Sequence, residues 1–247
     1  METFHNEQFL TYAQKGSMEE MKRAMVQGNV DVNYQDKEGS VFFQIQGNTA
    51  MFYAIMHNHL EVVRYLIQND ASLEVYNAQG SGPLHLAAEK MNKEIVLLLV
   101  INQADPNLKN QSGQRPGDGI TEIRTLINNL TAESKAFNAL KQPQKQKLQA
   151  IFEDIDYDNS KYIDNAKAVK FNKYIEDTIT DNQAEKDAKD FIKSVALCNP
   201  ERGVNIDEWF FSFSKLIVVD PAAFDKFIED YDKQVEKKQK LRHQMQD

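Results

Sequence analysis

The chain has 247 residues, a formal net charge of −8, 41% hydrophobic residues and 27% charged residues, which indicates a folded globular protein of one or two domains. The acidic balance disfavours nucleic acid as a partner, because binding to phosphates needs a basic face. No apolar run approaches the ~20 residues of a membrane helix, so we expect no membrane insertion.

The N-terminal residues 1–7 are not basic and no apolar run follows them, so we expect no signal or transit peptide. The single cysteine, Cys198, excludes an intramolecular disulfide and a cysteine zinc cluster. A chain without disulfides suits a reducing compartment, and we therefore predict a cytoplasmic protein.

The first half of the chain repeats itself with a period of 33 residues. Gly47, Gly80 and Gly113 are spaced by this interval, and other positions keep the same register. The matching pairs are Ala54 with Ala87, Leu66 with Leu99, Ala71 with Ala104, Asn77 with Asn110, and Pro83 with Pro116. Such self-similarity indicates small repeated units that stack and bury a continuous core.

Four stretches carry a resemblance to a known family. "GSGPLHLAA" (80–88) resembles the opening of the first helix of an ankyrin repeat, and "HLEVVRYLIQNDASLEVYNAQG" (59–80) resembles the second helix and the following hairpin. Residues 15–39 are similar to a polar first repeat, and residues 113–127 to a truncated last repeat. The resemblance implies about three repeats and a truncated cap over residues 1–130, with protein partners on the concave face.

This sequence departs from the family pattern at three positions. Asp70 and Gln103 stand where the family usually has Gly after its second helix, so we expect left-handed, slightly strained or rearranged turns there. Phe52 replaces the His of the opening motif in the second repeat, whereas His85 keeps it in the third and is predicted to be structural.

An insertion, "GSVFFQIQG" (39–47), lengthens the hairpin between the first two repeats by about eight residues relative to the 33-residue period. Its apolar residues would be pushed outward; these are Val41, Phe42, Phe43 and Ile45. Two interpretations stay open. The tip is an anchor that inserts into a partner protein, or it folds back and completes the core of a short stack.

The 33-residue register ends before residues 131–144, whose polar composition and Pro143 predict a linker or helical spacer. Apolar residues then recur at helical spacing, at Leu148, Ile151, Phe152 and Ile155. The segment "DYDNSKYIDNAK" (156–167) follows at once. A helix, an acidic loop and a second helix form the arrangement of an EF-hand.

An EF-hand loop binds calcium through oxygen ligands at positions 1, 3, 5, 7 and 9 and a bidentate Glu at position 12. The resemblance assigns these positions to Asp156, Asp158, Ser160, the Tyr162 carbonyl, Asp164 and finally Lys167. Lys161 stands where Gly usually makes the sharp turn, which strains its backbone. Because lysine offers no oxygen ligand, we expect the loop to keep the shape of a calcium site without the metal.

A second loop, "LCNPERGVNIDEW" (197–209), fits the same pattern as a partner of the first. Val204 takes the central hydrophobic position and Glu208 takes position 12, while Asn199 and Glu201 fall at positions 3 and 5. Leu197 replaces the first acid and Arg202 stands at the Gly position. We therefore expect Glu208 to be an unoccupied remnant of a metal site.

A final helix is predicted from Asp220 as its N-cap and Pro221 in its first turn. Its apolar face would lie in the groove of the preceding helices or extend outward; it comprises Phe224, Phe227, Ile228, Tyr231 and Val235. The basic end, residues 236–247, suits an acidic partner, or it is a solvated helix end whose cations match the helix dipole.

The predicted fold is all-α, with ankyrin repeats over residues 1–130, a spacer over 131–144, an EF-hand-like pair over 145–219 and a C-terminal helix over 220–247. No pattern of nucleophile and base, phosphate loop or zinc protease is present, so we expect no catalytic residues, no cofactor and no enzyme. The resemblance implies a scaffold or adaptor in a larger intracellular assembly. We expect this assembly to belong to the cytoskeleton or to a cilium. The alternatives are a calcium sensor and the regulatory subunit of an enzyme.

Overall fold

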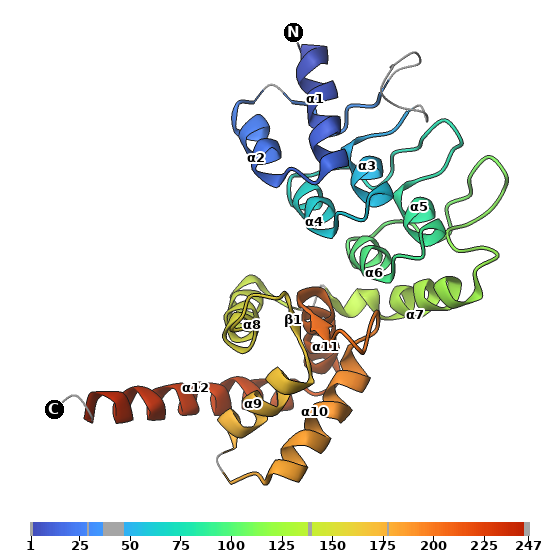
Figure 1. The fold of residues 1–247 in the computed structure, drawn as a ribbon. Helices are drawn as coiled ribbons and strands as arrows, with labels where there is room; N and C mark the ends of the chain where they lie inside the picture. The colour runs from blue at the N-terminus through green and yellow to red at the C-terminus, as the bar shows by residue number, and fades with distance from the viewer. Residues whose placement is uncertain (1, 29, 37–46, 138–139, 177, 245–247) are drawn as a thin grey trace. The chain divides into compact units, whose positions relative to one another are not determined.

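The computed structural model describes the chain apart from residues 1, 29, 37–46, 138–139, 177 and 245–247. The chain divides into two compact units, Met1–Ser134 and Lys135–Asp247 (Figure 1). Among the described helices, none is long and apolar enough to cross a membrane.

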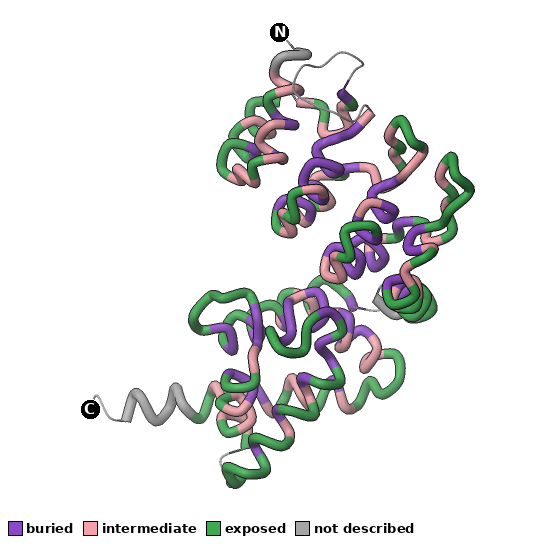
Figure 2. Tube along the Cα trace, turned by 45° about the vertical axis from the view of Figure 1, so that its right-hand side comes forward, coloured by how far each residue is buried: buried purple, intermediate pink, exposed green. Residues whose placement is uncertain are grey.

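The first unit is a stack of short antiparallel helices joined by exposed loops. Its helices are α1 (Glu2–Lys15), α2 (Met18–Val26), α3 (Ala50–Met56), α4 (Leu60–Gln68), α5 (Pro83–Glu89), α6 (Lys93–Ile101) and α7 (Thr121–Phe137). α3 packs against α1, α4 and α5, and α6 packs against α4 and α5. Figure 2 shows that burial follows these helices, whereas the hairpin turns between repeats are largely exposed.

α6 illustrates why these residues form a buried helix. The side chain of Asn92 caps its first turn by accepting a hydrogen bond from the Ile95 amide at 3.0 Å. All residues from Ile95 to Ile101 are buried, as expected for a helix that is apolar on every side.

The helix ends at Asp70 and Gln103 adopt the left-handed backbone that the repeat register predicts, with φ of 59° and 71°. In each turn the next amide closes the helix: Ala71 donates to the Leu66 carbonyl and Ala104 to the Leu99 carbonyl, both at 3.0 Å. Asp70 and Gln103 thus adopt the left-handed turn that glycine usually makes, and this conformation is less favourable for them than for glycine.

His85 ties its own repeat to the next one. Its Nδ1 accepts a hydrogen bond from the Gly82 amide at 3.2 Å, so Nε2 carries the proton and donates to the Gln114 carbonyl at 2.9 Å. Phe52, at the equivalent position one repeat earlier, is fully buried and cannot make these bonds.

The second unit consists of two helix–loop–helix segments and a final helix. Its elements are α8 (Gln142–Ile155), β1 (Tyr162–Ile163), α9 (Asn165–Ile175), α10 (Asp181–Val195), β2 (Val204–Asn205), α11 (Ile206–Val219) and α12 (Pro221–Gln244). The two loops meet through antiparallel β1 and β2, in which Tyr162 pairs with Asn205 and Ile163 with Val204. This short ladder fixes the two loops side by side.

An aromatic cluster forms the centre of the second unit. Trp209 on α11 is buried and its Nε1 donates to the Leu148 carbonyl of α8 at 3.0 Å, which fixes the ring. Its ring centroid lies 4.6 Å from that of Phe213 and 5.9 Å from that of Phe152. The tryptophan therefore links the two helix–loop–helix segments.

The final helix α12 has two different halves. Near its start, Phe224 and Tyr231 are buried, and Phe227 packs on Phe213 with ring centroids 4.7 Å apart. Asp220 caps it, accepting from the Ala223 amide at 3.0 Å. Figure 1 shows its later turns extending beyond the other helices of this unit. Both predicted arrangements occur in one helix, since the helix packs inward as far as Val235 and its last turns project.

Candidate functional site

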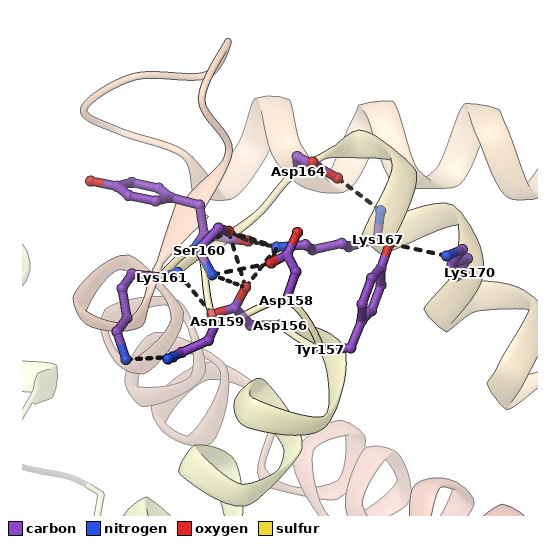
Figure 3. A network of polar contacts seen from close by, with 10 residues as sticks. Asp156, Tyr157, Asp158, Asn159, Ser160, Lys161, Asp164, Lys167 and Lys170 are labelled. Carbon is purple, nitrogen blue, oxygen red and sulfur yellow. Dashed lines mark hydrogen bonds and ion pairs between the residues drawn. The ribbon is translucent and has the colours of Figure 1, made fainter.

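The loop between α8 and α9 gathers most of the predicted ligand residues around one point. The side chains of Asp156, Asp158 and Ser160 lie together (Figure 3). The Ser160 hydroxyl is 3.1 Å from Asp156 Oδ1 and 3.2 Å from the carbonyl oxygen of Tyr162. Asp164 does not join them. Its carboxylate instead caps α9 by accepting a hydrogen bond from the Lys167 amide at 2.9 Å.

The ammonium group of Lys167 lies at the point where these oxygens converge. Nζ is 2.6 Å from Asp156 Oδ1, 2.6 Å from Ser160 Oγ and 2.9 Å from the Tyr162 carbonyl oxygen. It also donates to Asp158 Oδ1. The residue is only 2% exposed, so the loop surrounds a buried cation supplied by the chain itself.

The electrostatics of this cluster favour the charged forms of Lys167 and Asp158. Burial by itself lowers the pKa of Lys167, but the hydrogen bonds and charges of Asp156 and Asp158 outweigh it and raise the pKa above its ordinary 10.5. The hydrogen bond from Lys167 lowers the pKa of Asp158 to about 2. Lys167 and Asp158 are thus both ionised across the neutral range.

The backbone of the loop also binds Asp156. The amides of Ser160 and Lys161 donate to its two carboxylate oxygens at 3.2 and 2.8 Å. Lys161 reaches this position with φ of 73°, the left-handed conformation expected where a glycine usually stands. Asp156 therefore has amide donors on both oxygens in addition to the ammonium.

The residues present do not fit a calcium ion. Calcium takes 6–8 oxygen ligands at about 2.3–2.6 Å, and here the position of the terminal bidentate carboxylate holds an ammonium that already occupies the converging oxygens. Across the described part of the chain, no group of three or more His, Cys, Asp or Glu side chains is arranged to hold a metal ion.

The second loop places its predicted residues differently. The Glu208 carboxylate is buried and accepts hydrogen bonds from the Cys198 amide at 2.7 Å and the Asn205 amide at 3.0 Å. Burial raises its pKa, and these amides partly oppose the rise. Asn199 and Glu201 are exposed, and Asn199 Oδ1 accepts from a loop amide. Glu208 therefore holds the loop backbone, a role that sequence reasoning missed.

The sharp turn of the second loop lies one residue later than the sequence register indicated. Gly203, not Arg202, has the left-handed backbone, with φ of 106°. Arg202 instead places its guanidinium 4.0 Å from the centroid of the Tyr162 ring in the first loop. The cation–π contact joins the two loops alongside the β-ladder.

An apolar groove of about 510 Å³ opens within the second unit. Aromatic and aliphatic side chains from α9, α10 and α11 line it, among them Phe171, Phe191, Trp209, Phe213, Leu216 and Val219. Phe227 of α12 also lines it. Val219 is 82% exposed at the rim, so an apolar side chain stands in solvent beside an apolar cavity.

The predicted partner-binding residues Val41, Phe42, Phe43 and Ile45 lie outside the described residues. The structure does describe the base of their segment. The Asp36 amide donates to the Asn48 carbonyl at 3.0 Å, and the Asp36 carboxylate accepts from the Asn48 amide at 2.8 Å and from the Tyr53 hydroxyl. Asp36 and Asn48 are buried. This polar clasp, unrecognised in the sequence, brings the two ends of the insertion together.

Comparison with known proteins identifies a large part of the first unit. Residues 9–110 match the family model for ankyrin repeats in three copies, so this part of the chain is a stack of ankyrin repeats. Repeats of this family typically bind proteins and do not catalyse reactions, in agreement with the resemblance read from the 33-residue period.

Several proteins are similar to part of this chain. They include the transient receptor potential cation channel subfamily A member 1 of Homo sapiens (29% identical, 46% of this chain, 9% of the relative), the ankyrin repeat domain-containing protein 40 of Mus musculus (30%, 39% and 25%), and a glycerophosphocholine phosphodiesterase of Candida albicans (32%, 37% and 8%). The chain thus spans at most a quarter of the length of these relatives.

Proposed function

We propose that this protein is a non-catalytic adaptor that joins two protein partners. The ankyrin repeats hold one partner on their concave face, together with the insertion at residues 39–47. The groove of the second unit holds an amphipathic helix from another. The apolar groove beside Val219 is the observation that carries the second half of this proposal.

The second unit supports this role as a degenerate EF-hand pair. Two helix–loop–helix segments joined by a two-residue antiparallel ladder suit such a pair. Paired segments of this kind present an apolar groove in which a partner helix lays its apolar face. A volume of about 510 Å³ suits the anchoring side chains of such a helix, while α12 occupies the adjoining space.

The alternatives differ in what they require. A calcium sensor needs a loop that exchanges metal, whereas Lys167 occupies the oxygens of the first loop and backbone amides occupy Glu208. The regulatory subunit of an enzyme needs a catalytic partner, and its contacts would be made through the same two surfaces. The intracellular assembly stays a prediction, as does its cytoskeletal or ciliary setting. So does an acidic partner for residues 236–247.

The experiment compares two neighbouring valines. A display library of amphipathic helical peptides is selected on the full chain, and affinities are measured by fluorescence anisotropy. Val219→Asp places a charge on the groove lining, whereas Val218→Asp changes the adjacent residue, which is also exposed but does not line the groove. A charge buried against the apolar face of a peptide should weaken binding at least about tenfold, equal to 1.4 kcal/mol.

The proposal predicts peptides with one apolar face that bind the wild type and Val218→Asp equally and Val219→Asp weakly. Selections that yield no such helices, or equal binding to both variants, contradict it. Self-association that Val219→Asp abolishes would instead assign the groove to a second copy of this chain.

A further inference from the structure

We propose that Lys167 is the cation of its own loop. Its ammonium group takes the place of a divalent ion in holding residues 156–167 closed, so the second unit keeps its form at any calcium level. Replacing this lysine by a carboxylate would expose a divalent cation site that the wild-type chain conceals. The inference does not depend on which partner the groove holds.

The geometry of the loop is that of a coordinated cation. Two carboxylates, a hydroxyl and a backbone carbonyl, from residues 156, 158, 160 and 162, all direct an oxygen at the one Nζ atom. An ammonium has three protons, so four acceptors exceed what it can serve one by one, and at least one proton is shared. The loop therefore encloses the charge rather than pairing it with a single acid.

Nothing within α9 itself stabilises a positive charge at position 167. The residue lies in the first turn, where the amide ends carry partial positive charge and a cation is unfavourable. Its own amide is bound to the N-cap residue Asp164. The side chain is withdrawn from solvent and turned back into the loop (Figure 3), so the loop oxygens are what stabilise its charge.

Without the ammonium, the loop would hold the carboxylates of Asp156 and Asp158 close together with no counter-charge. Two carboxylates that lie close together repel each other, and a bound divalent cation would remove this repulsion. A glutamate at position 167 would add a third carboxylate at the place where calcium loops supply their bidentate ligand. The oxygens already present make the site latent rather than absent.

The test uses the full chain and three proteins: the wild type, Lys167→Glu and Lys170→Glu. Lys170 is an exposed residue of the same helix whose Nζ contacts the Tyr157 hydroxyl at 3.0 Å, so its replacement makes the same charge change outside the cluster. Terbium emission, excited through the nearby Tyr157 and Tyr162, reports binding in the loop. Thermal melts in EGTA, magnesium and about millimolar calcium, the weakest range of natural calcium loops, report stabilisation.

The proposal predicts that Lys167→Glu melts lower than the wild type in EGTA, recovers in calcium and shows saturable terbium emission. The wild type and Lys170→Glu should show neither stabilisation by calcium nor saturable terbium emission. Saturable terbium emission from the wild type, with a calcium-dependent rise in melting temperature, would overturn the proposal. A folded Lys167→Glu that binds no terbium would also overturn it.

Lys167→Gln provides a second variant if Lys167→Glu does not fold. It removes the positive charge while keeping N–H donors within the loop. It should bind terbium more than tenfold tighter than the wild type through Asp156 and Asp158. Equal affinity of Lys167→Gln and the wild type would contradict a role of the ammonium as the resident cation.

Discussion

At the scale of single residues, Lys167 decides the chemistry of its loop. Asp156 and Asp158 each direct a carboxylate oxygen at the ammonium of Lys167, so the residue at position 167 makes them ion-pair partners. The ammonium and the Asp156 carboxylate are both buried. Removing one partner of a buried pair costs far more than the net contribution of the pair, because the remaining charge is left uncompensated.

Lys167→Met should therefore destabilise the second unit by roughly 3–5 kcal/mol. Lys170→Met, an exposed change on the same helix, should stay within about 0.5 kcal/mol of the wild type. Urea denaturation followed by Trp209 fluorescence measures both, because Trp209 lies in the core of this unit. Equal stabilities for the two variants would show that the Lys167 contacts contribute little.

The stability difference between the wild type and Lys167→Met should depend on pH in a defined way. Asp158 has its pKa lowered from 3.8 to about 2, so its contribution is present above pH 3.8 and is lost as pH falls toward 2. Lys167 has a raised pKa, so its contribution is complete below pH 10.5 and is lost as pH rises through the folded-state pKa. Glu208 titrates in both proteins and cancels in the difference.

We therefore expect a plateau in this difference between about pH 4 and pH 10, with a decline on either side. Urea denaturation of both proteins across this range gives the profile. A difference that stays constant at every pH would assign the effect of Lys167→Met to lost packing instead of lost charge.

At the scale of elements, the ladder between β1 and β2 holds the two loops together, and Gly203 makes their close approach possible. A Cβ atom on Gly203 would lie 2.3 Å from the Ile163 carbonyl oxygen, and φ is +106°. A Cβ on Gly113, in the ankyrin repeats, would meet nothing within 4 Å at a φ of +75°.

Gly203→Ala should destabilise its unit by about 2 kcal/mol more than Gly113→Ala destabilises the repeats, because strain of the backbone is joined by a clash with backbone atoms. Denaturation midpoints of the two variants, each compared with the wild type, give this difference. If Gly203→Ala is tolerated as well as Gly113→Ala, the loops are not packed as closely as described.

The backbone conformation of the repeats and turns could be predicted from the sequence, whereas the hydrogen-bond partners of the side chains could not. The 33-residue register predicted the left-handed turns at Asp70 and Gln103, since repeats share one local geometry. Local register also placed Lys161 in its strained conformation. The same reasoning gave Glu208 only as the unoccupied remnant of a metal site, whereas the amides of Cys198 and Asn205 donate to it, and those bonds appear only once the loop is folded.

Contacts between distant residues escaped prediction for the same reason. The clasp of Asp36 and Tyr53 at the base of the insertion joins residues on either side of a segment that no periodicity describes. The sequence showed that Lys167 cannot ligate calcium. It did not show that the side chain turns back into the loop and contacts Asp156, because this depends on side-chain torsion angles. Sequence patterns thus located the loop, and the three-dimensional contacts defined its cation.

At the scale of the whole molecule, two units of different design are joined in one chain. The first unit contains the ankyrin repeats, and the second holds its loops with a ladder, a cation–π contact and an internal ammonium. Under the proposed adaptor role, this internal ammonium would keep the second unit formed at any calcium concentration.

The most direct measurement of this account is nuclear magnetic resonance of the lysine side-chain ammonium groups in the full chain. We predict one ammonium signal, from Lys167, that exchanges slowly with water. This signal should be absent from Lys167→Met and unchanged by about millimolar calcium. Rapid exchange of every lysine ammonium, or loss of the slow signal when calcium is added, would contradict it.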